Sequence, residues 1–259
     1  MDKIKISVIK DNFEDFIDKI KDLTDIGETI KIKIDNDNIF MYSMLGETAI
    51  LAFKSFLLKS DKYLKFKDEI KKPIEIIITN TKRLVKSLDF IKKTDSNINL
   101  NISCEDSDDD VFSARTMQVT GGKLRINWPS SESYEIKNID RHTLDRRLDF
   151  SNRKWSFIIS KDQFEDIKKL SNINSSKLID IVVNENGKVV ISESSAWDYQ
   201  VSTADIKSTS FVFNKRFLKC IDGEQDEIQF NLFENFILIK QKNSNLMLSY
   251  EQDFSDEEL

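Results

Sequence analysis

The strongest constraint on the fold is an internal repeat. Residues 10–15, with the sequence KDNFED, recur as residues 161–166, with the sequence KDQFED. A short strand-like run, residues 4–8 or residues 155–159, precedes each copy. Apolar residues at helical spacing follow each copy: Phe13, Phe16, Ile17 and Ile20 after the first, and Phe164, Ile167 and Leu170 after the second. We therefore predict that each copy is a strand followed by a helix.

A second repeat divides the chain further. Residues 82–88, KRLVKSL, are echoed by residues 215–221, KRFLKCI, and strand-like runs precede both. The two repeats alternate along the chain, which predicts four strand–helix units, two in each half. Residues 56–72, rich in lysine and aromatic residues, account for extra length in the first half.

Hairpin signals follow the predicted helices. In the second half, two alternating segments flank Asn186-Gly187, a pair that supplies the positive φ angles of a tight turn. In the first half, similar segments lie on both sides of residues 35–37, and another pair precedes Gly121-Gly122. These patterns indicate antiparallel strands between the helices.

The predicted fold class is α+β, with mostly antiparallel sheet and about one helix for every four or five strands. The 259 residues suffice for two hydrophobic cores, and six glycines and two prolines leave little material for linkers. We predict a first domain at residues 1–135, a polar connector at residues 136–152, and a second domain at residues 153–259.

The order of these units resembles that of the two-domain sliding clamps, or processivity factors, of tailed bacteriophages. This family is related in fold to the cellular and bacterial clamps. The resemblance covers nearly the whole chain. Its most characteristic segments are residues 119–129, where a glycine hairpin leads into LRINWP, and residues 157–190, which open the second domain.

The resemblance implies a homotrimeric ring of six similar clamp domains, each with two strand-helix-strand repeats. The helices would line a central hole that admits duplex DNA of any sequence, and the antiparallel sheets would form the outside. A clamp loader ATPase would open the ring, and a DNA polymerase would dock through a short peptide on one ring face. Such a clamp is no enzyme and needs no cofactor.

Two matching basic helix faces are the candidate DNA contacts. The net charge of −6 argues against general attraction to nucleic acid, so contacts must come from local segregation of charge. The candidates lie opposite the apolar side of their helices: Lys82, Arg83 and Lys86 in one helix, and Lys215, Arg216 and Lys219 in its repeat. Three further lysines are weaker candidates for DNA contact, because acidic residues occupy the first turns of their helices: Lys19, Lys168 and Lys169. A charged face on one helix also fits simple solvation.

Partner peptides, by the same resemblance, would dock near the connector and the C-terminal tail. The candidates are apolar residues in polar surroundings: Met44 and Leu45 at a predicted strand end, Leu144, Leu148 and Phe150 in the connector, and Phe254 in the tail. Packing of a loop onto its own domain is the alternative explanation. The sequence does not identify residues of the subunit interface.

No motif for catalysis or metal binding is recognisable. A phosphate-binding loop is missing, Cys104 and Cys220 lack metal-ligand spacing, and His142 has no nucleophile beside it. Residues 105–110 are acidic but lack the spacing of a calcium loop, and Glu193 and Asp198 have no supporting glycosidase pattern. Two rival functions stay open, a β-rich interaction scaffold that does not encircle DNA and an α+β enzyme that uses acidic residues.

The predicted location is cytoplasmic. The first residues lack the apolar stretch of a signal peptide, and no apolar run approaches the roughly 20 residues of a membrane span. The abundance of isoleucine, lysine and asparagine suggests an A·T-rich genome, and we expect a viral one. A viral protein of this kind would act in the cytoplasm of a bacterial host.

Overall fold

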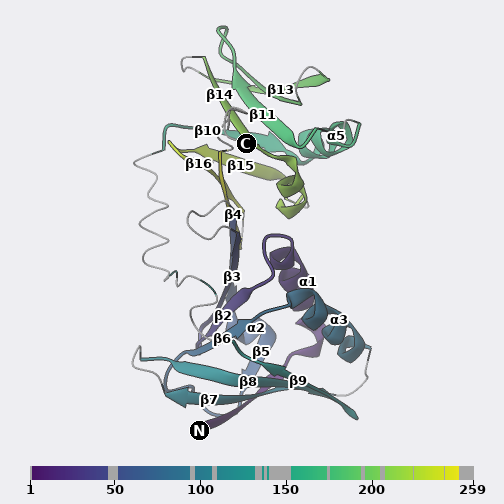
Figure 1. The fold of residues 1–259 in the computed structure, drawn as a ribbon, viewed down its shortest axis with the longest axis vertical. Coiled ribbons are helices and arrows are strands. Elements are labelled where there is room, and N and C mark those ends of the chain that lie inside the picture. Colours follow the sequence, from purple (N-terminus) through teal and green to yellow (C-terminus); the bar gives the residue numbers. More distant parts are fainter. Residues whose placement is uncertain are drawn as a thin grey trace, which may run out of the picture. The chain divides into compact units, whose positions relative to one another are not determined.

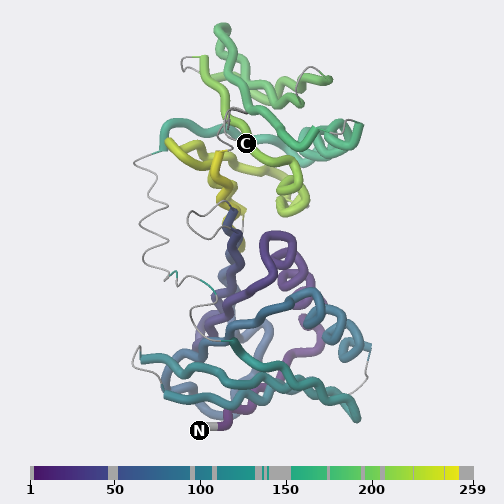
Figure 2. Tube along the Cα trace, viewed as in Figure 1, coloured from purple at the N-terminus to yellow at the C-terminus, as the bar shows by residue number. Residues whose placement is uncertain are grey.

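The chain forms two compact units, Met1–Leu45 with Phe53–Asp140, and Gly46–Ala52 with Arg141–Leu259. In Figure 2 the purple-to-teal part of the chain builds the first unit and the green-to-yellow part builds the second. The computed structural model describes residues 2–45, 52–93, 97–106, 110–131, 136, 139, 153–173, 176–193, 196–204, 208–223, 225–241 and 243–250.

The first unit is built on one large sheet with few helices (Figure 1). Its elements in chain order are β1 (Asp2–Val8), η1 (Lys10–Asn12), α1 (Phe13–Thr24), β2 (Ile30–Ile34), β3 (Asn38–Leu45), β4 (Ala52–Lys59), α2 (Ser60–Tyr63), β5 (Leu64–Phe66), β6 (Ile74–Ile78), α3 (Thr81–Lys92), β7 (Ile98–Asp106), β8 (Phe112–Gly121) and β9 (Leu124–Pro129). The strand order is β4-β3-β2-β6-β8-β7-β1-β5, and β9 pairs with β8. All pairs with a determined register are antiparallel except β6 with β8.

Both long helices of this unit, α1 and α3, pack side by side on one face of the sheet (Figure 1). Their buried residues recur every three or four positions: Phe13, Phe16, Ile17, Ile20 and Leu23 in α1, and Leu84, Val85, Leu88 and Ile91 in α3. The strands alternate, and on β1, β7, β8 and β9 the opposite face carries polar side chains, as in the hydrogen bonds from Ser7 to Asn99 and from Gln118 to Asn127. The helices therefore cover the apolar face.

Residues 56–72, the predicted extra segment, form the end of β4, the short helix α2 and strand β5. β5 pairs with the end of β1, and α2 is joined to α1 through Asp15. The Tyr63 hydroxyl donates to the Asp15 carboxylate over 2.6 Å, and the Lys19 ammonium lies 2.7 Å from the other carboxylate oxygen. Burial alone would raise the pKa of Asp15, but these hydrogen bonds outweigh it and lower that pKa to about 2.

Asp15 is expected to make the folded state sensitive to acid. Its folded pKa of about 2 lies below the ordinary value of 3.8, so its stabilising contribution is complete above pH 3.8 and is lost as the pH falls from there toward 2. Asp15→Asn should be less stable than the parent at neutral pH, and the difference should shrink across this window. Thermal unfolding followed by circular dichroism tests this, with exposed Asp61→Asn as control. A difference that is constant with pH would contradict it.

The second unit repeats the arrangement. Its elements are β10 (Trp155–Ser160), α5 (Lys161–Ser171), β11 (Leu178–Val183), β12 (Lys188–Glu193), β13 (Trp197–Thr203), β14 (Thr209–Asn214), η4 (Lys215–Cys220), β15 (Glu227–Leu232), β16 (Phe236–Lys240) and β17 (Ser244–Ser249). The strand orders are β10-β15-β16-β17 and β13-β12-β11-β14. Ser160 and Gln163 form a capping box that fixes the start of α5. The two-domain α+β fold agrees with the prediction.

The fourth predicted helix is wrong in kind, because residues 215–220 form the 3-10 helix η4 and not an α-helix. The Asn214 side chain caps its start by accepting a hydrogen bond from the Arg216 amide. Phe217, Leu218, Cys220 and Ile221 are buried, but Asp222 and Gly223 follow Ile221, so the apolar stripe ends there. The six residues of η4 are too few to offset the cost of α-helix nucleation.

Candidate nucleic-acid interface

The exposed side of α3 is basic. Lys82, Arg83 and Lys86 are exposed, whereas the residues between them face the core. Neither Lys82 nor Lys86 forms an ion pair with any residue that the structure describes, and the Arg83 guanidinium lies over the Trp128 ring, 5.9 Å from its centroid. The ammonium groups of the two lysines can therefore accept an external anion without first breaking an internal contact.

Two of these cations lie where a helix usually carries acids. The first turn of α3 has no acidic side chain and contains Lys82 and Arg83. Cations near the positive end of the helix dipole cost roughly 0.3–1 kcal/mol each. Because helix stability does not explain this placement, it favours a role in binding an external anion.

The neighbouring helix α1 is different. Its exposed residues at positions 14 and 18 are acidic, as is the exposed Asp11 of the preceding η1, and the cations of α1 are paired. Lys19 binds Asp15, while Lys21 lies 3.1 Å from Asp18 and 3.5 Å from Asp89 of α3. The unpaired positive charge on the helix-covered face is thus concentrated on α3, and Lys19 stays a weaker prediction.

In the second unit, η4 exposes Arg216 and Lys219. The Arg216 guanidinium stacks over the Phe217 ring, 4.6 Å from its centroid, which limits the conformations of the side chain. The Lys215 ammonium is instead engaged inside the protein. It lies 2.8 Å from the Glu193 carboxylate and donates a hydrogen bond to the Ser171 carbonyl over 2.8 Å. Arg216 is therefore better placed than Lys215 to meet an external phosphate, and Lys219 is exposed as well.

The two lysines of α5 lie in weak surface ion pairs. Lys168 is 3.5 Å from Glu165, and its ammonium lies 5.5 Å from the Phe164 ring centroid. Lys169 is 3.5 Å from Asp166 and largely exposed. Exposed pairs of this kind are worth about 0–1 kcal/mol, so a phosphate could compete for either lysine.

The paired-carboxylate hypothesis does not fit the geometry of Glu193. Glu193 is fully buried, accepts a hydrogen bond from the Trp197 indole, and is neutralised by Lys215. Asp198 lies on the next strand, opposite Ser192. A carboxylate fixed in this way is structural and has no access to a substrate.

The other candidate ligand groups are also engaged. Lys72 lies 2.7 Å from Asp106 and 3.3 Å from Asp110, whereas residues 107–109 lie outside the described part of the chain. Both cysteines are buried thiols. Within the described ranges, no three His, Cys, Asp or Glu side chains gather closely enough to hold a metal ion, and no helix is long and apolar enough to cross a membrane.

The predicted partner-peptide surface is only partly described. Met44 and Leu45 lie half-buried at the end of β3. Leu144, Leu148, Phe150 and Phe254, like His142, lie outside the described residues, so their roles stay predictions.

Two connector residues that the sequence did not single out do contact the first unit. Ile136 and Ile139 are buried, and the Ile139 amide donates to the Tyr42 hydroxyl over 3.1 Å. Burial raises the pKa of Tyr42 well above its ordinary value. The sequence feature that could have indicated this contact is Tyr42 itself, a bulky aromatic residue on the strand face opposite the helices. The start of the connector therefore packs onto the sheet.

Comparison with known proteins finds the same fold at low sequence identity. No family model and no curated protein matches the chain. Among solved structures, it resembles the DNA polymerase III β chain of Streptococcus pneumoniae (12% identity, TM-score 0.64, 98% of this chain and 66% of that one). It also resembles PCNA of Thermococcus kodakaraensis (13% identity, TM-score 0.62, 95% of this chain and 100% of that one). A third similar structure is the Helicobacter pylori β clamp bound to a DNA ligase peptide (13% identity, TM-score 0.63, 99% of this chain and 68% of that one).

These likenesses show a two-domain α+β fold of the sliding-clamp type, with large antiparallel sheets and few helices. The chain spans 66% of the length of the bacterial β chain and the full length of the archaeal PCNA.

Proposed function

We propose that this chain is a DNA sliding clamp, which encircles duplex DNA and tethers a replicative DNA polymerase. The observation that carries the proposal is the row of exposed cations on α3, on the helix-covered face of a clamp fold. Phosphates are recognised by charge whatever the base sequence, so such a row suits a protein that must move along any duplex. Arg216 and Lys219 would extend the same contact in the second unit.

Ring closure explains how few contacts suffice. A protein that neutralises only a few phosphates binds DNA with non-specific dissociation constants of roughly 10⁻⁴ to 10⁻⁶ M. A closed ring prevents escape except at DNA ends, and weak contacts then permit sliding. We propose a homotrimer, since six domains would require three two-domain chains, opened by a separate ATP-driven loader. The clamp itself would perform no chemical step.

Two strand edges are candidates for the subunit contacts. Among the described strands, β9 pairs only with β8, and β13 is the last strand of its four-stranded sheet. Pairing of β9 from one copy with β13 of the next would continue the antiparallel sheets around the ring and leave no open edge at either strand.

The cellular context belongs to the same proposal. The isoleucine- and lysine-rich sequence and the resemblance to phage clamps support a bacteriophage protein acting in the cytoplasm of its host. The polymerase would dock by a short peptide, as the DNA ligase peptide is bound to the Helicobacter pylori clamp.

A test without a loader uses a linear duplex biotinylated at both ends. Copies that thread onto the free ends should become trapped when streptavidin blocks them, and should survive a wash at high salt. Without streptavidin the same wash should remove them, because only topology resists salt. Light scattering should give about three times the 30.2 kDa chain mass. Equal loss from blocked and open DNA would instead favour the scaffold that does not encircle DNA.

A further inference from the structure

The outer edge of β1 is only half covered. On one side β7 pairs with β1 from Asp2 to Val8. On the other side β5 pairs only with Ile6–Val8, and no other segment that the structure describes pairs with residues 2–5. Every second residue of a strand directs its N–H and C=O groups toward the same edge. Residues 2–5 therefore present backbone donors and acceptors that no described strand engages.

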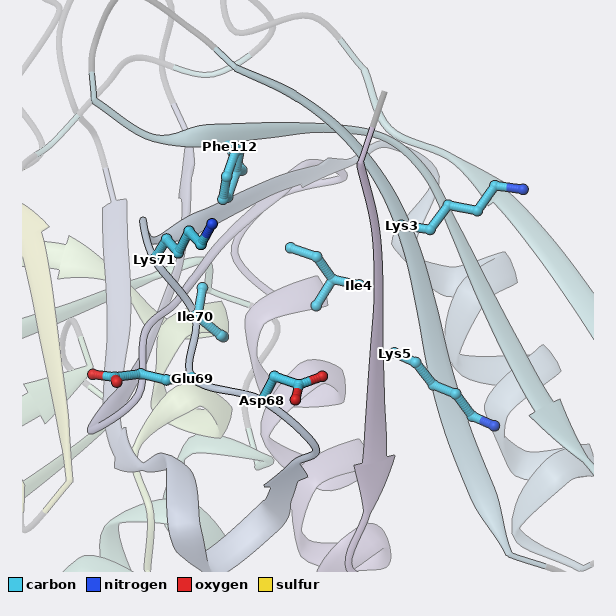
Figure 3. A pocket seen from close by; sticks show the side chains of 8 residues that line it. All are labelled: Lys3, Ile4, Lys5, Asp68, Glu69, Ile70, Lys71 and Phe112. Carbon is cyan, nitrogen blue, oxygen red and sulfur yellow. The ribbon is translucent and has the colours of Figure 1, made fainter.

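A cavity of about 300 Å³ lies beside this open edge. Figure 3 shows Ile4 pointing from β1 toward the loop that carries Ile70, with Phe112 above. These three residues form the apolar part of the cavity lining, and its charged part includes Asp68, Glu69 and Lys71 of the loop. Lys3 and Lys5 point to the opposite side of the strand. This alternation places the apolar Ile4 side chain on one side of the edge and two exposed cations on the other.

The cavity wall is held in place from several directions. The Asn36 side chain donates to the Ile70 carbonyl over 3.0 Å and accepts from the Ile70 amide over 2.9 Å. Lys72 is paired with Asp106, and the Phe112 amide donates to the Pro73 carbonyl over 2.8 Å. A ligand would therefore enter a preformed site and would not have to order the loop on binding.

We propose that the edge of β1 binds an extended segment of a partner protein as an added antiparallel strand. The segment would continue the line of β5, which already occupies this edge from Ile6 to Val8. Main-chain hydrogen bonds to residues 2–5 would provide affinity, and the side chains on either side of the edge would provide specificity.

The register defines the chemistry of the partner. In an antiparallel pair, directly opposite residues direct their side chains to the same face. The partner residue opposite Ile4 would thus enter the cavity, where an apolar side chain would pack against Ile4, Ile70 and Phe112. Those opposite Lys3 and Lys5 would lie beside the two ammonium groups, where acidic side chains fit best. The preferred partner segment therefore has the order acidic, apolar, acidic.

A charge exchange tests the proposal. The probes are two fluorescein-labelled peptides, Gly-Ser-Glu-Ile-Glu-Ser-Gly and Gly-Ser-Lys-Ile-Lys-Ser-Gly, and the readout is fluorescence anisotropy. The parent chain should bind the acidic peptide about tenfold more tightly, from two opposite-charge pairs. Lys3→Glu with Lys5→Glu should reverse the preference. The matched control, Lys188→Glu with Lys240→Glu, changes two exposed strand lysines of the second unit and should keep the parent preference.

Hydrogen exchange locates the contact. Bound acidic peptide should slow exchange of backbone amides within residues 2–5 and leave residues 82–86 unchanged. The proposal is overturned if the parent and the charge-reversed variant bind both peptides equally, or if protection falls elsewhere. Protection that rises with protein concentration without peptide would also overturn it, because a second copy would then occupy the edge. None of these outcomes depends on DNA binding.

Discussion

Replacing Lys82, Arg83 and Lys86 together with alanine is expected to weaken equilibrium binding to open-ended duplex DNA at least about tenfold at low salt. These residues supply the exposed cations of α3, and the first turn of that helix has no acidic side chain. For every phosphate that is no longer neutralised, the slope of log K against log salt should also become shallower by about 0.9. Fluorescence anisotropy at several salt concentrations measures both quantities.

The triple alanine substitution should affect retention on DNA with blocked ends much less than it affects equilibrium binding to open-ended DNA. If the ring alone prevents escape, the triple alanine variant should remain trapped behind streptavidin once it has threaded. A control with Lys65, Lys67 and Lys123 changed to alanine removes the same charge from exposed positions of the first unit outside α3 and should bind DNA like the parent. Equal weakening by both variants would mean that net charge, and not the face of α3, governs binding.

Lys215→Met should lower the free energy of unfolding by about 3–5 kcal/mol, because it leaves the fully buried Glu193 carboxylate without its cation. Urea denaturation followed by tryptophan fluorescence is a direct measurement, since the Trp197 indole donates to the same carboxylate.

The double variant separates the cost of an uncompensated buried charge from the cost of removing the Lys215 ammonium itself. Adding Glu193→Leu to Lys215→Met removes both charges, and this double variant should be more stable than Lys215→Met alone. Exposed Lys219→Met is the control within the same helix. If the Lys215→Met variant is instead as stable as the parent but binds DNA more weakly, the main role of Lys215 is DNA contact and not the ion pair with Glu193.

The same ion pair changes how the enzyme hypothesis must be tested. Neutralising Glu193 is expected to destabilise the second unit, so a loss of any activity would not identify a catalytic carboxylate. Asp198→Asn avoids the buried network and is the more informative variant for that purpose.

The repeat in the sequence predicted the strand–helix units of α1, α3 and α5, but it did not predict α2 or β5. KDNFED and KDQFED mark the starts of α1 and α5, because apolar residues at a spacing of three and four follow both copies. Asn186-Gly187 similarly predicted the turn between β11 and β12, where Gly187 has a φ of 70°. Local spacing and turn chemistry carry this information, so no tertiary structure was needed.

The roles of single charged residues required the tertiary structure. Lys82 and Lys215 occupy the same place in their repeats, yet only Lys215 has a buried carboxylate within reach, supplied by a strand 22 residues earlier. The half-covered edge of β1 likewise depends on where β5 ends. Periodicity determines which face of an element is apolar, because it is a property of neighbouring residues. Ion pairs and open strand edges depend on segments that only folding brings together, and for that reason the sequence could suggest a basic surface but could not decide which of its lysines are available.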